Sequence, residues 1–308
     1  MKVIFMGTPD FAVPSLEELN KEHDVCCVVC QPDKPKGRGK KMVFPVVKEK
    51  ALELGIEVLQ PEKINDEEFM DKLESYNADI FVVAAYGQIV CERILNMPAY
   101  GCINVHGSLL PLYRGAAPIQ QSIIDGCEKT GVTIMHMAKG LDSGDMISKA
   151  ECEITKEDTY ATLTEKLSKI GAELLMSTMK DIENGTAERI PQNDNESTYA
   201  GMIHRETGHI DWTKTAEEID CLSRGLDPQP AAYAVYKGEV LKIFRVQPLA
   251  KEYSVACGTI AETDKKGFIV QCGEGSARVV MMQAKGGKIM PADAYMRGHK
   301  IDTGVVLE

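Results

Sequence analysis

The feature that most limits the possible folds is a set of short apolar runs without polar alternation. The segment ADIFVVAAY (78–86) is the clearest example, and KVIFMG (2–7) and HDVCCVVCQ (23–31) are similar. A strand that is apolar on both sides is typical of a parallel sheet whose two faces are covered by helices. These runs therefore predict an α/β sheet in the first part of the chain.

Amphipathic segments between the runs supply the covering helices. Alternating strands and helices predict βαβ units. We expect helices over residues 13–22, 44–55, 87–96 and 160–182, and further strands over 103–107, 130–138 and 145–155. In the last helix, Leu163, Leu167, Ile170, Leu174 and Leu175 share one face, which predicts packing against the sheet.

The pattern changes beyond residue 208. A helix over 215–226 precedes five short strands separated by Gly and charged turns, over 231–238, 240–249, 258–262, 267–273 and 277–283. Short strands at this spacing favour a small barrel of the OB type. The polar segment NGTAERIPQNDNES (184–197) interrupts both patterns. We therefore expect a first domain over 1–188, a linker over 189–206 and a second domain over 207–308.

Composition indicates a folded cytoplasmic protein. The chain is 44% hydrophobic and 26% charged, and no window has the ~20 apolar residues of a membrane span. The first apolar run ends at Gly7 and Pro9, which argues against a signal peptide. We expect the ten cysteines to be free thiols. Cys27 and Cys30 form a C-x-x-C without a second ligand pair, so no metal site is expected.

The net charge of −11 argues against a uniformly basic nucleic-acid surface, yet one strongly basic run is present. It is QPDKPKGRGKK (31–41), which contains Lys34, Lys36, Arg38, Lys40 and Lys41. The run follows the second strand, and ligands of α/β sheets collect at the carboxyl ends of strands. A solvated charge run is the alternative, but the acidic surroundings favour contact with a phosphate backbone.

The segment INVHGSLLPLYRGAAP (103–118) carries the candidate chemistry. Asn104 and His106 are two apart on a strand, so their side chains point the same way. An amide can donate to a developing oxyanion and an imidazole can move a proton. The turn GLDSGDM adds Asp142 and Asp145. A buried Asn and His satisfied by the backbone would give the same pattern, so both interpretations stay open at this point.

The combination of motifs is more specific than any one of them. N-x-H, S-L-L-P, YRGAAPI and D-x-G-D together resemble the folate-dependent formyltransferases. MGTPDFAVPSLEEL, QPDKPKGRGKK, HIDW and MRGHKI extend the resemblance from residue 1 to nearly 308. Within that family, the chain looks like the members that formylate methionyl-tRNA. Gln121 departs from the usual Trp, and Asp227 and Ala231 depart from the common Asn and Gly.

The resemblance implies an enzyme that moves the formyl group of 10-formyltetrahydrofolate, its co-substrate, to the α-amino group of methionyl-initiator tRNA. It implies a Rossmann-like domain followed by an OB-like tRNA-binding domain, with no metal, and we expect a monomer. The catalytic positions fall on Asn104, His106 and Asp142: the first two hold the oxyanion, and Asp142 orients and charges His106.

The resemblance also implies the binding residues. The positions that cradle the pterin of folate fall on Ser108, Leu109, Leu110 and Pro111. Arg38, within the basic run, falls where the family approaches the tRNA acceptor end.

Two alternatives remain at the level of the sequence. The chain could formylate a small amine, such as glycinamide ribonucleotide or an amino sugar, although the second domain and the basic run argue against this. It could also be a folate- or RNA-binding module without catalysis, in which Asn104 and His106 are structural.

Overall fold

The predicted parallel sheet is present. In the computed structural model, which describes residues 1–36 and 41–308, seven strands lie in the order β10-β9-β7-β6-β1-β2-β5. Neighbours from β7 to β5 are parallel, whereas β9 and β10 pair antiparallel. The strands are β1 (Lys2–Gly7), β2 (Asp24–Val29), β5 (Val58–Leu59), β6 (Ile80–Ala84), β7 (Cys102–His106), β9 (Lys129–His136) and β10 (Met146–Glu153).

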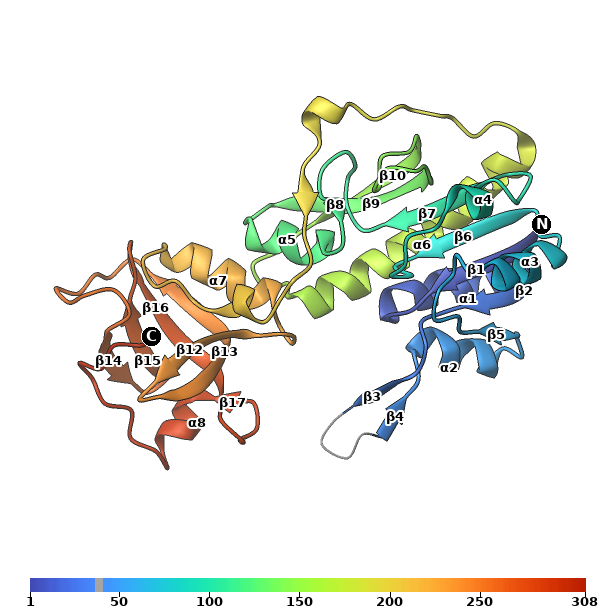
Figure 1. Cartoon of the computed structure of the whole chain (residues 1–308). Helices are drawn as coiled ribbons and strands as arrows, with labels where there is room; N and C mark the ends of the chain where they lie inside the picture. Colours follow the sequence, from blue (N-terminus) through green and yellow to red (C-terminus); the bar gives the residue numbers. More distant parts are fainter. Residues whose placement is uncertain (37–40) are drawn as a thin grey trace. The chain divides into compact units, whose positions relative to one another are not determined.

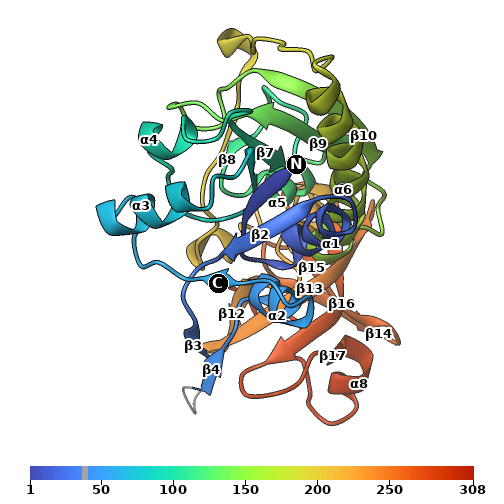
Figure 2. The ribbon, with the colours of Figure 1, turned by 90° about the vertical axis from the view of Figure 1, so that its right-hand side faces the viewer.

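Helices cover both faces of this sheet, as Figure 2 shows, with α3 and α4 on one side and α1 and α6 on the other. One face carries a core in which Met70 and Leu73 of α3 meet Ile4, Phe81 and Val83 of the strands. The helices along this part of the chain are α1 (Val13–Glu22), α2 (Val46–Glu53), α3 (Glu67–Ser75), α4 (Glu92–Leu95), α5 (Pro118–Ile124) and α6 (Tyr160–Asn184), of which α5 falls almost entirely in the second compact unit. Cys27 and Cys30 are fully buried, as expected of strand cysteines.

The described chain divides into two compact units. The first contains Met1–Pro118, Lys129–Glu153 and Thr164–Gly201, and the second contains Ile119–Glu128, Ile154–Leu163 and Met202–Glu308. The first unit also holds two small strand pairs, β3 (Lys34–Lys36) with β4 (Lys41–Val43) and β8 (Arg114–Gly115) with β11 (Tyr199–Ala200). Figure 1 shows both pairs.

The second unit is built on antiparallel strands in the order β12-β13-β16-β15-β14. Helix α7 (Ala216–Gly225) precedes them and begins with a capping box between Thr215 and Glu218. The strands are β12 (Ala232–Tyr236), β13 (Glu239–Leu249), β14 (Ile260–Asp264), β15 (Gly267–Gln271) and β16 (Ser276–Ala284), followed by β17 (Met290–Pro291) and α8 (Ala292–Met296).

The last residues close this sheet into a barrel. Glu308 exchanges two backbone hydrogen bonds with Val235 of β12, and the amides of Ile260 and Leu307 bond the carbonyls of Val305 and Gly258, at the start of β14. The terminal segment therefore joins the two edge strands and removes their unpaired backbone groups. The second unit is therefore a closed antiparallel sheet, and its assignment to the OB type stays a prediction.

One predicted helix is wrong over most of its length. We expected residues 87–96 to be helical, but α4 contains only Glu92–Leu95. Ala85 and Gly87 have φ angles of +47° and +89°, which interrupt a right-handed helix. The side chain of Gln88 also accepts a 2.9 Å hydrogen bond from the amide of Ile64. The segment that follows β6 is therefore a loop.

Ala231, one of the departures from the family pattern, has a φ of +70°. This is the left-handed region, in which glycine carries no steric cost. The angle explains why glycine is common at this position, and alanine is strained there.

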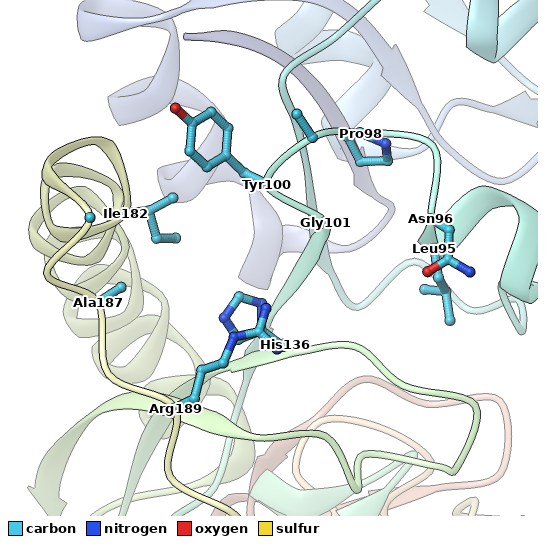
Figure 3. Close-up of a pocket in the computed structure, with 11 residues that line it drawn as sticks. Leu95, Asn96, Pro98, Tyr100, Gly101, His136, Ile182, Ala187 and Arg189 are labelled. Carbon is cyan, nitrogen blue, oxygen red and sulfur yellow. The ribbon is translucent and has the colours of Figure 1, made fainter.

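A cavity of about 450 Å³ opens at the edge where β7 begins, opposite the end that carries His106. Figure 3 shows Arg189 beside His136, with Tyr100 and Ile182 on other walls. Burial lowers the pKa of His136, and the charge of Arg189 lowers it further, against a smaller opposing effect of Asp145. The neutral imidazole is thus favoured here.

Within residues 1–36 and 41–308, no helix combines the length and apolarity needed to cross a bilayer.

The barrel closure predicts unequal effects of two neighbouring substitutions. Leu307 is 3% exposed and Val306 is 50% exposed. Leu307→Ala should lower the free energy of unfolding of the second unit by about 2 to 4 kcal/mol, because it removes a buried side chain at the closure. Val306→Ala should change it by less than about 0.5 kcal/mol. Fluorescence of the single tryptophan, Trp212, in the same core, reports this unfolding. Equal effects of both changes would contradict the closure.

The lowered pKa of His136 predicts an acid-sensitive first unit. Below about pH 6.5, the imidazole of His136 is protonated in the unfolded chain but stays largely neutral in the folded chain. The free energy of unfolding therefore falls as the pH falls. In His136→Gln, the loss of melting temperature between pH 7.5 and pH 5.5 should be smaller than in the unaltered chain, as measured by circular dichroism. The Trp212 transition of the second unit serves as the internal control. An unchanged pH dependence would refute this role of burial.

Candidate active site

Strand β7 brings the two central side chains to one place. Its pairing with β6 on one side and β9 on the other puts the strand inside the sheet. Asn104 and His106 are two residues apart, so they share a face, and they are 9% and 5% exposed. Both lie at the carboxyl end of the strand, the edge at which α/β proteins bind ligands.

The loop between β9 and β10 delivers a carboxylate to this pair. Asp142 Oδ2 lies 3.8 Å from Nδ1 of His106, and Oδ1 lies 3.5 Å from the amide nitrogen of Asn104. The backbone amide of Gly115 donates a 2.8 Å hydrogen bond to Oδ2. Sequence analysis predicted that these three side chains act together, and the structure places them in contact range.

The partners of His106 define its tautomer. Nε2 lies 3.0 Å from the backbone oxygen of Tyr113, and a carbonyl can only accept. Nε2 therefore carries a proton and donates it to Tyr113. Nδ1 is the ring nitrogen that faces Asp142, so it is the atom at which His106 can gain or lose a proton.

The Ser-Leu-Leu-Pro loop after β7 is turned largely inward. Ser108 and Leu110 are fully buried. The hydroxyl of Thr133 accepts from the amide of Leu110 at 3.1 Å and donates to the carbonyl of Ser108 at 2.7 Å. Leu109 and Pro111 are partly exposed. These two side chains and the loop backbone are therefore the groups available to a ligand, and contact with folate stays a prediction.

Sequence reasoning missed a second loop at this edge. The chain builds β1, β2 and β5 in one direction and then returns to add β6 and β7 on the other side of β1, so the sheet order reverses between β1 and β6. Crevices at such reversals are the usual ligand sites of α/β sheets. Ile89, in the loop after β6, is 82% exposed there. Its signal, GQIV (87–90) directly after a buried strand, was interpreted as the start of a helix.

Bonds from neighbouring loops fix the backbone of this second loop. The carbonyl of Tyr86 accepts from the hydroxyl of Thr8 at 2.9 Å and from the side-chain amide of Gln31 at 3.2 Å. An exposed apolar side chain on a fixed backbone, beside the strand that carries Asn104, suits one face of a flat heterocycle. The residues present therefore fit a folate-type ligand.

Arg114 is a third feature that the sequence did not reveal. Its side chain is buried, at 2% exposure, between the site and the segment after α6. Burial acts to lower the pKa of its guanidinium, but hydrogen bonds with Asp194 and Tyr199 outweigh this and raise it. The side chain is thus a fixed cation next to Tyr113 and Gly115, whose backbone groups bond His106 and Asp142.

The basic run is described only in part. Lys34, Lys36 and Lys41 lie in the β3–β4 hairpin, in which Lys36 pairs with Lys41, and Lys34 is exposed. The structure therefore places three of the five predicted residues on a hairpin that follows β2 closely, whereas Arg38 and Lys40 lie outside the described residues.

Potential metal ligands do not gather anywhere in the part of the chain that the structure describes: it contains no group of three His, Cys, Asp or Glu side chains arranged to hold an ion.

Comparisons with known proteins agree with this fold and site. A family model described as formyl transferase matches residues 1–179, and its C-terminal-domain counterpart matches residues 202–300. The methionyl-tRNA formyltransferase of Agathobacter rectalis is 49% identical, over 99% of this chain and 98% of its own. That of Acetivibrio thermocellus is 46% identical, over 100% of this chain and 99% of its own.

Solved structures share the fold at lower identity. A sugar 3N-formyltransferase, WlaRD, determined with dTDP and 5-N-formyl-THF, has a TM-score of 0.68 at 19% identity, with 94% of this chain and 99% of that chain covered. An N-formyltransferase from Helicobacter canadensis, determined with folinic acid and dTDP-3-aminofucose, has a TM-score of 0.66 at 21% identity, covering 91% and 98%. Taken with the full-length relatives, the chain belongs to the formyl transferase family, among the methionyl-tRNA formyltransferases.

Proposed function

We propose that this chain transfers the formyl group of 10-formyltetrahydrofolate to the free α-amino group of methionyl-initiator tRNA, giving N-formylmethionyl-tRNA for translation initiation. The convergence of Asn104, His106 and Asp142 at the carboxyl end of β7 is the observation that carries the chemistry. The identity of the acceptor is supported by relatives of that name that match the chain over its whole length.

Each of the three side chains has a distinct task in this proposal. Asn104 donates an N–H to the formyl oxygen, where negative charge develops as the amine attacks the formyl carbon. His106, through Nδ1, takes the proton that the amine loses, and Asp142 stabilises the resulting imidazolium. The amine forms a bond to the formyl carbon, the bond from that carbon to N10 breaks, and the proton held by His106 passes to N10 of the departing tetrahydrofolate. The transfer is direct, so no covalent enzyme intermediate is required.

This assignment revises one detail of the expected mechanism. Sequence analysis gave both Asn104 and His106 the task of holding the oxyanion. In the structure, Nε2 of His106 is occupied by the Tyr113 carbonyl, and Nδ1 faces Asp142. We therefore assign proton transfer to His106 and leave the oxyanion contact to Asn104.

The binding partners are proposed on separate grounds. Folate is held between the loop that contains Ile89 and the Ser108–Pro111 loop, since both flank Asn104 at the same sheet edge. The tRNA acceptor end is contacted by the basic run, through Lys34, Lys36, Arg38, Lys40 and Lys41, because charge-assisted contacts to phosphate need such a run in an otherwise acidic chain.

We further infer that the chain works as a monomer in the cytoplasm. The ten cysteines are free thiols, as suits a reducing compartment.

The direct test is an acceptor panel. With 10-formyltetrahydrofolate as donor, the purified chain should formylate charged initiator Met-tRNA and leave elongator Met-tRNA, free methionine, glycinamide ribonucleotide and an amino-sugar nucleotide unchanged. Transfer only to a small amine would keep the three catalytic residues but overturn the acceptor. Folate binding without transfer to any acceptor would refute the proposed enzyme.

The assigned tasks predict large catalytic losses with the fold preserved. Asn104→Ala and His106→Ala should each lower kcat by at least about 10²- to 10³-fold, because each removes a group that acts in the transition state. Quench-flow or steady-state formyl transfer measures the loss, and circular dichroism confirms folding. His136→Gln, at the opposite edge of the sheet, is the matched control and should retain normal kcat at neutral pH. Near-normal turnover in either active-site variant would contradict the task assigned to that residue.

A further inference from the structure

The segment after α6 runs back along the first unit as a strap, which we define as residues 186–201. Figure 1 shows it, in yellow, passing from the end of α6 to β11 beside β8. Ile190 and Met146 exchange two 2.9 Å backbone hydrogen bonds at its start. At its end, Tyr199 and Ala200 pair in parallel with Arg114 and Gly115. The strap is thus fixed at both ends by backbone bonds.

Between these anchors, Gln192 reaches the loop of Asp142. Its side-chain amide donates two hydrogen bonds of 2.8 Å, one to the carbonyl of Asp142 and one to that of Gly144. Its oxygen accepts a 3.0 Å bond from Nε of Arg114. Both donors and the acceptor of this side chain are therefore used, which fixes its orientation.

The backbone to which Gln192 donates its hydrogen bonds is strained. Asp142 has a φ of +46°, which is the left-handed region. This conformation is energetically unfavourable for a residue other than glycine, and it persists only where surrounding contacts hold the backbone in place. The backbone of Gly144 in the same loop lies very close to that of His136. A Cβ atom at Gly144 would lie 1.9 Å from the carbonyl oxygen of His136. The two bonds from Gln192 hold the backbone of this loop, while the amide of Gly115 holds the carboxylate itself.

The same strap holds the other half of the catalytic pair. The hydroxyl of Thr198 accepts a 2.8 Å bond from the amide of Tyr113, and its carbonyl accepts a 2.9 Å bond from the amide of Arg114. Tyr113 has a φ of +58° and presents the carbonyl that accepts from His106. The strap thus fixes both the imidazole and the carboxylate, through different residues.

We propose that Gln192 is a positioning residue of this enzyme: it holds the Asp142 loop in the conformation that aims the carboxylate at Nδ1 of His106. This rests on the proposed function of the site. Gln192 makes no contact with the reacting groups, so its effect is on the geometry of the proton transfer and not on the binding of either substrate.

Two substitutions test the proposal. Gln192→Ala removes all three hydrogen bonds and should lower kcat by about 10- to 100-fold, the scale of a small misplacement of catalytic groups, with KM for both substrates within about twofold. Gln192→Glu keeps the size and the bond from Arg114, but it sets a carboxylate against two carbonyl oxygens. It should therefore lose at least as much kcat as Gln192→Ala.

The glutamate variant separates positioning from simple packing. If Gln192 only filled space or paired with Arg114, Gln192→Glu would turn over normally, and that result would overturn the proposal. Asn195→Ala is the matched control, since Asn195 lies exposed in the same strap. It should keep normal kcat. Circular dichroism and folate binding by fluorescence titration show that each variant is folded and loaded.

The outcomes also separate this inference from the proposed function. Absence of formyl transfer in the unaltered chain defeats the proposed function itself. Normal transfer in the unaltered chain together with normal kcat in both Gln192 variants defeats only the positioning role. A rise of KM with unchanged kcat would likewise refute positioning and assign Gln192 to substrate binding.

Discussion

The position of β7 is the constraint on which the site depends. Parallel pairing with β6 sets the register of Asn104 against Val83, and antiparallel pairing with β9 sets it against Met135. A slip of one residue would turn the polar pair to the opposite face of the sheet and bring apolar neighbours to the active edge. In β7 such a slip would also separate Asn104 and His106 from Asp142, which contacts only the face that they now occupy.

The loops at that edge are held in conformations that they would not adopt alone. Tyr113 and Asp142 both have positive φ angles, and each such residue costs of order 1–3 kcal/mol. A hydrogen bond that Thr198 accepts from Tyr113, and bonds that Gly115 and Gln192 donate to Asp142, offset this cost locally. The arrangement presents a preformed carboxylate–imidazole pair, so little reorganisation remains to be done when a substrate arrives.

Most of the fold follows from the periodicity of apolar residues in the sequence. Helices α1, α6 and α7 lie close to their predicted limits, because their apolar periodicity is regular, and five predicted C-terminal strands became β12 to β16. The proximity of Asn104 to His106 follows from strand alternation alone. The proximity of Asp142 to them was expected from the family resemblance, since no local rule links a loop residue to a strand nearly forty positions away.

The errors and omissions have physical causes. The loop after β6 resembles a helix in composition, and its conformation is decided by positive φ angles and by the contact of Gln88 with a distant loop. The bonds from Gln192 to the Asp142 loop join one side chain to single backbone carbonyls, which leave no periodicity to detect. The inward turn of Ser108 depends on Thr133, which is distant in sequence. Tertiary contacts of this kind are invisible to local pattern.

The strap also affects how the chain can be divided. The two family models match residues 1–179 and 202–300, so neither covers it. A fragment cut at the end of α6 would keep Asn104, His106 and Asp142 but lose every bond that Gln192 and Thr198 make. The compact unit that contains these three side chains extends to Gly201, so the strap belongs to it although neither family model includes the strap.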